Sequence, residues 1–192
     1  MALLLLTISS VFAQAPTFAN IQGITYAGTG CSVGSLHPYI TPDRSAFHIE
    51  FHDLKAVDGN GQDTTANRKN CQLSVQLNYQ QGYQFRLAAV QYTGHLSVPT
   101  GQTAIERSSY YFQGKTDTAA FESDWNGPAY YDYTVTDVVS SNPNVWSDCS
   151  NTANLEINAE VRASSNGPYT SISVNSATGF ALQAYQFEWR QC

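Results

Sequence analysis

Apolar and neutral polar residues alternate without a break in Cys71-Gln72-Leu73-Ser74-Val75-Gln76-Leu77-Asn78-Tyr79. Because successive side chains of a β-strand point to opposite faces, this period of two predicts a strand with one buried and one solvated face. Gln80-Gln81-Gly82 follows as a turn signal, and apolar residues then alternate again from Tyr83 to Ala89. We therefore expect residues 71–90 to form a β-hairpin.

Shorter runs with the same period occur on both sides of this segment. They cover residues 46–51, 130–139, 155–163, 172–174 and 185–189. Turn signals rich in Gly, Pro and Asn separate the runs, and no segment has the periodicity of an amphipathic helix. Short strands at this spacing, with polar outer faces, predict an all-β fold, a single-domain antiparallel β-sandwich over residues 16–192.

The composition agrees with strands whose exterior is polar but uncharged. Only 12% of the 192 residues are charged, whereas Ser, Thr, Asn and Gln together account for 63 of them. Soluble domains usually contain roughly 25% charged residues. The net charge is −6 and the chain has three lysines, Lys55, Lys69 and Lys115. Since phosphate binding needs clustered Lys and Arg, we expect no nucleic-acid partner.

The N-terminus has the pattern of a secretory signal. Residues 2–12 are an apolar stretch, too short for a bilayer span of about 20 residues. Ala13 offers a cleavage site and Ala15 a second one, so residues 1–13, possibly to 15, are interpreted as a signal peptide. A buried N-terminal strand is the alternative. The C-terminal residues 185–192 are not a hydrophobic tail, and we expect a secreted, extracellular protein without a membrane anchor.

Four cysteines follow the predicted signal peptide, namely Cys31, Cys71, Cys149 and Cys192. In an oxidising compartment an even number predicts two disulfides, and four cysteines allow three pairings. We favour Cys31–Cys71 and Cys149–Cys192. Each bridge would close a loop of about 40 residues and stabilise the fold by about 3–4 kcal/mol through the unfolded state. A single bridge with two buried free thiols is the alternative.

Several blocks of residues occur in a characteristic order and spacing. They are residues 28–31, 68–73, 78–85, 106–114, 146–149, 155–158 and 189–192. Together these blocks resemble the secreted domain-of-unknown-function 4360 family, which is common in filamentous fungi, over roughly residues 20–192. The resemblance implies a secreted, four-cysteine, mostly β protein. It assigns no catalytic residue.

His48, Glu50 and His52 form the motif that most resembles a metal site. On a strand, side chains two residues apart lie on the same face, about 6.5–7 Å from one another. Two imidazoles and a carboxylate suit zinc, copper or non-haem iron, and His37 or His95 could supply a further ligand. A solvated polar face is the simpler interpretation, so we expect no cofactor and keep a metal ion as the alternative.

Aromatic residues are frequent at 12% of the chain. Consecutive rings at 110–112 and 130–131 point to opposite faces of their predicted strands, so some of them face outward. Exposed Tyr and Trp rings can stack on sugar rings, while neighbouring amide and carboxylate groups bind the sugar hydroxyls. Tyr111, Tyr131 and Trp125 are therefore the predicted binding residues. Coverage of these rings by the sandwich and its loops is the alternative.

These observations predict a secreted, monomeric, non-catalytic protein that binds an extracellular polysaccharide or another cell-wall component. A polysaccharide-active hydrolase is the first alternative, because it needs only two carboxylates at a suitable separation. Glu156 and Glu160 share the polar face of one predicted strand. A secreted effector or protein-interaction module is the second alternative, and it would expose a large apolar patch.

Overall fold

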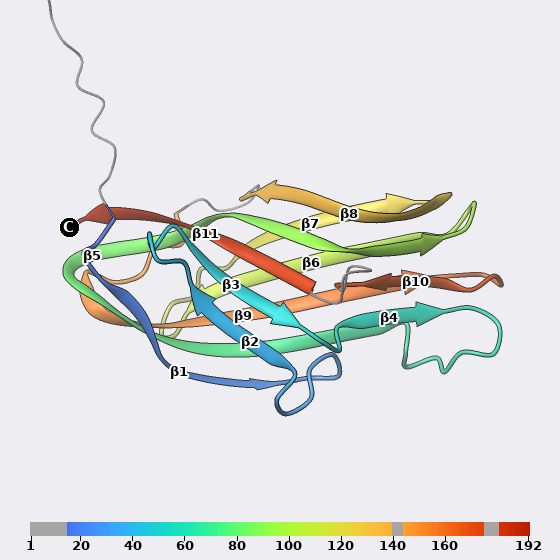
Figure 1. Ribbon diagram of the computed structural model, residues 1–192, viewed down its shortest axis with the longest axis horizontal. Coiled ribbons are helices and arrows are strands. Elements are labelled where there is room, and N and C mark those ends of the chain that lie inside the picture. The colour runs from blue at the N-terminus through green and yellow to red at the C-terminus, as the bar shows by residue number, and fades with distance from the viewer. Residues whose placement is uncertain (1–14, 140–143, 175–180) are drawn as a thin grey trace, which may run out of the picture.

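The computed structural model describes residues 15–139, 144–174 and 181–192 (Figure 1). The predicted signal peptide, residues 1–13, lies outside the described residues. All the regular elements in the described part are β-strands. This part of the chain accordingly has no helix long and apolar enough to cross a membrane.

The long strand β5 (Arg68–Val98) organises the fold because it belongs to both layers of the molecule. Before residue 80 it pairs with one set of strands, and from Tyr83 onward it pairs mainly with another. Figure 1 shows the strand turning back on itself between these two parts, and Gly82 has a positive φ of 85° at this bend. The hairpin predicted for residues 71–90 is therefore wrong. Its two strands exist, but they lie in different layers.

Each half of β5 is the centre of one antiparallel layer. The first layer consists, in order, of β1 (Ala19–Ala27), the first half of β5, β9 (Ser150–Ser164), β6 (Thr103–Phe112) and β7 (Ala119–Asn126). The second consists of β2 (Leu36–Ile40), β3 (Ala46–Phe51), β11 (Ala181–Gln191), the second half of β5, and β8 (Ala129–Val138). β10 (Thr170–Ser173) pairs with residues 95–97 of β5, just after the part of β5 that pairs with β11. On its other side, β10 pairs with β4 (Lys55–Asp58).

The core lies between the two layers, as the alternating pattern predicts. The apolar positions of residues 71–79 are all buried. Phe85 of the second layer and Phe112 of the first have ring centroids 5.2 Å apart at an interplanar angle of 84°. Edge-to-face contacts of this kind add to the stabilisation that comes from burying apolar area. The antiparallel β-sandwich predicted from the sequence is thus confirmed.

A β-bulge in β5 changes which alternate positions of the strand point into the core. Leu87 pairs with Phe187, but Ala89 pairs with Gln186, so Ala88 is an extra residue in the ladder. The extra residue shifts the side-chain phase of the strand. The alternation expected as far as residue 89 is present, since Leu87 and Ala89 are both buried, and beyond the bulge the buried positions follow the other phase, beginning with Val90 and Tyr92.

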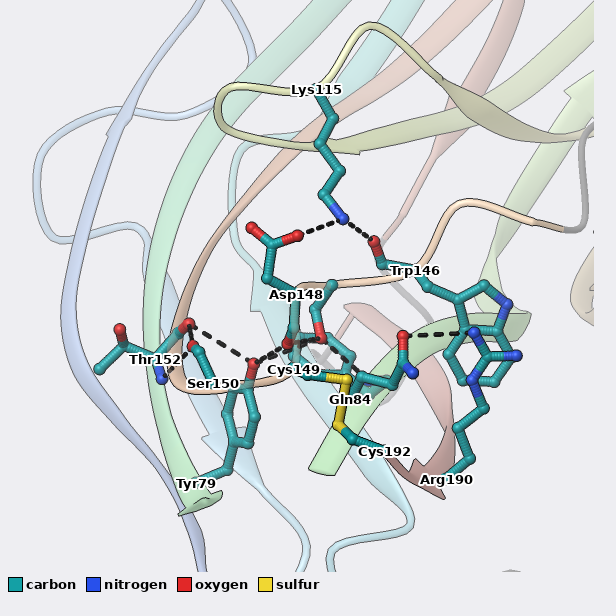
Figure 2. The surroundings of a disulfide bond; sticks show 12 residues. Tyr79, Gln84, Lys115, Trp146, Asp148, Cys149, Ser150, Thr152, Arg190 and Cys192 are labelled. Atoms are coloured by element: carbon teal, nitrogen blue, oxygen red, sulfur yellow. Dashed lines mark hydrogen bonds and ion pairs between the residues drawn. A yellow bond between two sulfur atoms is a disulfide. The ribbon is translucent and has the colours of Figure 1, made fainter. Parts of the chain in front are cut away.

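Both disulfides have the pairing favoured from the sequence, Cys31–Cys71 and Cys149–Cys192. The first bridge is buried in the core, whereas both cysteines of the second are exposed. Figure 2 shows the second bridge joining the end of β11 to the start of β9. Beside it, the guanidinium carbon of Arg190 lies 3.8 Å from the centroid of the Trp146 ring, a cation–π contact. This contact holds the segment before β9 against β11.

Candidate functional site

The outer face of the first layer carries the strongest candidate binding surface. Strand pairing places Ser74 of β5 beside Glu156 of β9, and Glu156 beside Tyr111 of β6. The next row on this face consists of Gln72, Asn158 and Ser109. Directly opposed side chains on one face of an antiparallel pair are about 4.5–5.5 Å apart. The two rows therefore form continuous polar strips across the strands.

A shallow groove of about 290 Å³ follows these two rows. The first row begins at Thr25 of β1, which pairs with Ser74, and ends at Tyr111. Tyr111 is 42% exposed, whereas its neighbours Tyr110 and Phe112 are buried in the core. The outward ring expected from consecutive aromatic residues is thus present at position 111, at one end of a row of hydrogen-bonding groups.

Hydrogen bonds between β5 and β9 orient the polar groups of the groove. The Ser74 hydroxyl donates to Oε1 of Glu156 at 2.7 Å, and Asn70 Nδ2 donates to Oδ1 of Asn158 at 3.3 Å. Within the described part of the chain, Oε2 of Glu156 accepts no hydrogen bond. The groove therefore presents a carboxylate that Ser74 holds through one oxygen and that can accept a hydrogen bond from a ligand through the other.

A second polar cluster lies on the same face, centred on Glu160. Arg68 donates to Glu160 from Nε at 2.8 Å and also from Nη2, and Arg162 donates from Nε. Glu160 is only 3% exposed although it points outward, because the guanidinium groups cover it. Burial acts to raise the pKa of Glu160, but the hydrogen bonds from Arg68 and Arg162 outweigh it and lower the pKa. Glu160 is therefore an ionised, structural carboxylate.

This arrangement argues against Glu156 and Glu160 as the carboxylate pair of a glycoside hydrolase. The two residues are four positions apart on β9, which corresponds to about 13 Å along an extended strand. Catalytic carboxyl groups of glycosidases are about 5–9.5 Å apart, and one of them must be protonated to act as the general acid. Glu160 is held in the charged form instead.

The structure does not bring the three predicted aromatic residues together. Trp125 pairs with Ala104, seven positions along β6 from Tyr111, or about 23 Å on an extended strand. Its ring packs against Tyr133, with 4.7 Å between the centroids. Tyr131 lies on β8 in the second layer and is 48% exposed. Of the three, Tyr111 is the one that lines the groove.

The predicted metal ligands lie on and next to β3, in the second layer. Nδ1 of His48 is 2.8 Å from the Tyr39 hydroxyl, and the ring of His52 packs edge-on against that of His37. Burial lowers the pKa of His48 more than the neighbouring carboxylates raise it. Among the residues that the structure describes, no three His, Cys, Asp or Glu side chains are placed to hold a metal ion. The arrangement gives no support to a metal at His48, Glu50 and His52.

Sequence reasoning missed Ser74, Asn158 and Ser109 as members of the groove. The signal for each was present, since all three occupy the outward phase of a strand with period two. Their proximity could not be predicted from the sequence, because it depends on which strands are neighbours and in what register they pair.

Comparisons with known proteins place the chain in a family. Residues 18–192 match the family model described as a domain of unknown function, DUF4360. An uncharacterized secreted protein of Arthroderma benhamiae is 35% identical over 182 residues, which cover 92% of this chain and 73% of that protein.

Two of the similar solved structures are TmCBM61 in complex with β-1,4-galactotriose and TmCBM27, a carbohydrate-binding module studied for mannan recognition. TmCBM61 is 8% identical with a TM-score of 0.28, and the match covers 89% of this chain and 90% of TmCBM61. TmCBM27 is 7% identical with a TM-score of 0.32, and the match covers 90% of this chain and 99% of TmCBM27. From the family model and the fungal relative, we conclude that the chain belongs to the DUF4360 family.

Proposed function

We propose that this secreted protein is a non-catalytic carbohydrate-binding protein and that the groove on the outer face of the first layer is its binding site. The observation that carries the proposal is the exposed ring of Tyr111 at the end of a row formed with Glu156 and Ser74. A sugar ring has apolar C–H faces and polar hydroxyl edges. A site for it needs an apolar surface beside a few well-placed polar groups, and this row supplies both.

The shape of the face favours a chain of sugars over a single one. Two further hollows lie on the same face, one on each side of the groove along the direction of the strands. One is lined by Gln76, Gln113 and Asn154, and the other by Arg68, Thr103 and Arg162. Hollows lined by polar positions of β5, β9 and β6 thus occur at several places along this face. An internal segment of a polysaccharide can lie across it without needing a free end.

Pull-down on insoluble chitin, β-glucan and cellulose tests the proposal. We expect the folded protein to be retained on at least one of these polysaccharides. Removing the ring with Tyr111→Ala should weaken retention at least about tenfold, equivalent to about 1.4 kcal/mol of binding free energy. Tyr130→Ala is the matched control, because Tyr130 is 61% exposed but lies on β8 in the second layer. Absence of retention on all three, with a folded sample, would contradict the proposal.

A further inference from the structure

The charge of the groove is carried by one side chain. Glu156 is the single Asp, Glu, Lys, Arg or His residue among those that line the groove, and the other polar groups there are hydroxyls and amides. Ser74 donates to one carboxylate oxygen of Glu156, and the other accepts no hydrogen bond from the described residues. A ligand in the groove therefore meets a localised negative charge with a vacant acceptor.

The arginine residues on the same face lie outside the groove lining, and each is paired with a carboxylate other than Glu156. Arg68 and Arg162 both bind Glu160, and Arg107 lies 3.7 Å from Glu122 in an ion pair. Arg68 and Arg162 are each four positions along their strands from the groove residues Gln72 and Asn158, or about 13 Å, whereas Arg107, two positions from Ser109, is paired with Glu122. At about 0.1 M salt, charges separated by more than about 10 Å are largely screened. The arginine groups thus attract little negative charge into the groove itself.

We infer that the groove is selective for uncharged glycans, with Glu156 accepting a hydrogen bond from a sugar hydroxyl and repelling carboxylate or sulfate groups on acidic polysaccharides. This inference rests on the binding function proposed above. A hydrogen bond from a hydroxyl to a carboxylate is stronger than one between neutral groups, so the same side chain favours a neutral sugar and disfavours an acidic one. The chain's net charge of −6 acts in the same direction at longer range.

Affinity electrophoresis through gels that contain a neutral or an acidic polysaccharide tests this selectivity. Soluble β-glucan and hydroxyethylcellulose serve as the neutral ligands, and polygalacturonate and alginate as the acidic ones. We expect the wild-type protein to be retarded by a neutral ligand at least tenfold more strongly than by an acidic one. The difference should persist at moderate salt, because the repulsion acts at contact distance.

Glu156→Gln identifies the source of the selectivity. The amide keeps the size of the side chain and one acceptor oxygen but removes the charge. We expect weaker retardation by the neutral ligand and stronger retardation by the acidic one. Asp132→Asn is the control, because it removes the same charge from the outer face of the second layer, where Asp132 contacts His95 at 2.7 Å. Thermal unfolding of each variant verifies that it is folded.

The outcomes separate this inference from the function on which it rests. Wild-type retardation by the acidic ligands that equals or exceeds that by the neutral ones overturns the selectivity and leaves carbohydrate binding intact. Equal behaviour of Glu156→Gln and Asp132→Asn overturns the role of Glu156. Absence of retardation in every gel, together with no retention on the insoluble polysaccharides, overturns carbohydrate binding itself.

Discussion

The hydroxyl group of Tyr133 lies 2.5 Å from Oε2 of Glu106, in the buried space between the two layers. Gln183 of β11 donates to the other carboxyl oxygen, Oε1, at 2.9 Å. Glu106 belongs to the first layer, whereas Tyr133 and Gln183 belong to the second. Burial raises the pKa of Glu106 to about 8, even though these two hydrogen bonds act to lower it. Glu106 is therefore mainly a neutral acid at pH 7.

The surrounding groups can accommodate the extra proton. A protonated Glu106 can donate to the oxygen of Tyr133, whose hydroxyl can then donate to the carbonyl of Ser173 at 3.4 Å. On the other side, the Tyr185 hydroxyl donates to Oε1 of Gln183 at 2.6 Å. A buried polar network stabilises a unique core only when its members are satisfied, and the neutral form meets that condition here.

Glu106→Gln should make the stability less dependent on pH. The carboxyl pKa rises on folding from its ordinary 4.5 to about 8, so the folded state binds more protons between these values. The contribution of Glu106 to the stability is therefore largest below the unfolded pKa and falls as pH rises toward 8, by at most about 1.4 kcal/mol per pH unit. The amide mimics the neutral acid and does not titrate. Urea unfolding across this pH range measures the slope.

A control separates this effect from the titration of other groups. Glu122→Gln removes an exposed carboxylate on the neighbouring strand β7 and should keep the wild-type slope. Glu106→Gln should also be more stable than the wild type near pH 8, where the wild type has to bury a charge. Parallel pH profiles for Glu106→Gln and the wild type would show that Glu106 is not the titrating group.

Gly94→Ala should disrupt the approach of Tyr133 to its partners. A Cβ atom at position 94 would lie 2.1 Å from the carbonyl oxygen of Ser173 and 2.5 Å from the Tyr133 hydroxyl oxygen. We expect a loss of about 1–3 kcal/mol in the free energy of unfolding, measured with urea. Gly23→Ala on β1 is the control, since the nearest neighbour of its Cβ atom, Oε1 of Gln76, would be at an ordinary 3.7 Å. Equal stability of the two variants would refute the role of Gly94.

The fold was predictable as far as local periodicity reaches. The period of two in residues 71–79 identified the buried face of the strand correctly, because alternation is a property of the strand alone. Whether the turn at residues 80–82 joins two paired strands or two layers does not depend on local sequence alone. The rings of Tyr79 and Phe85 lie 5.5 Å apart in the core, one on each side of the bend. This contact between layers takes the place of the cross-strand pairing that a hairpin would have formed.

The candidate site was predictable only in part, for a related reason. Tyr111 follows from the alternation of rings in its own strand. The position of Glu156 beside it depends on the pairing of β6 with β9, which brings together residues far apart in sequence. The buried environment of Glu106 was harder still to predict. Its side chain points into the core, and its partners, Tyr133 and Gln183, come from the opposite layer.

Glu160→Gln should destabilise the first layer more than the loss of an exposed carboxylate does. Glu160 is buried beneath Arg68 and Arg162, and the substitution leaves two cationic groups without their shared partner. We expect a loss of about 1–3 kcal/mol, moderated because both arginines are half exposed. Glu122→Gln breaks an ion pair with Arg107 that is exposed on both sides, and it should change the stability by less than about 1 kcal/mol. Equal effects in urea unfolding would contradict this difference.

The two disulfides should differ in their accessibility to reductants. A thiolate must reach a sulfur atom of the bridge to open it. Cys149 and Cys192 are exposed at the end of β11, whereas Cys31 and Cys71 are buried in the core. Brief treatment of the native protein with a mild reductant, followed by alkylation, should therefore label Cys149 and Cys192 first. Mass spectrometry of the alkylated peptides measures the order of labelling.

The unfolded protein and a double variant provide the controls for this order. In denaturant, where neither bridge is covered, all four cysteines should be labelled at similar rates. Cys149→Ser with Cys192→Ser should abolish the fast labelling and leave the slow labelling of Cys31 and Cys71. It should also lower the free energy of unfolding by about 3–4 kcal/mol, since the bridge closes a loop of about 40 residues in the unfolded chain. Equal labelling rates for the two bridges in the native protein would show that burial does not protect Cys31–Cys71.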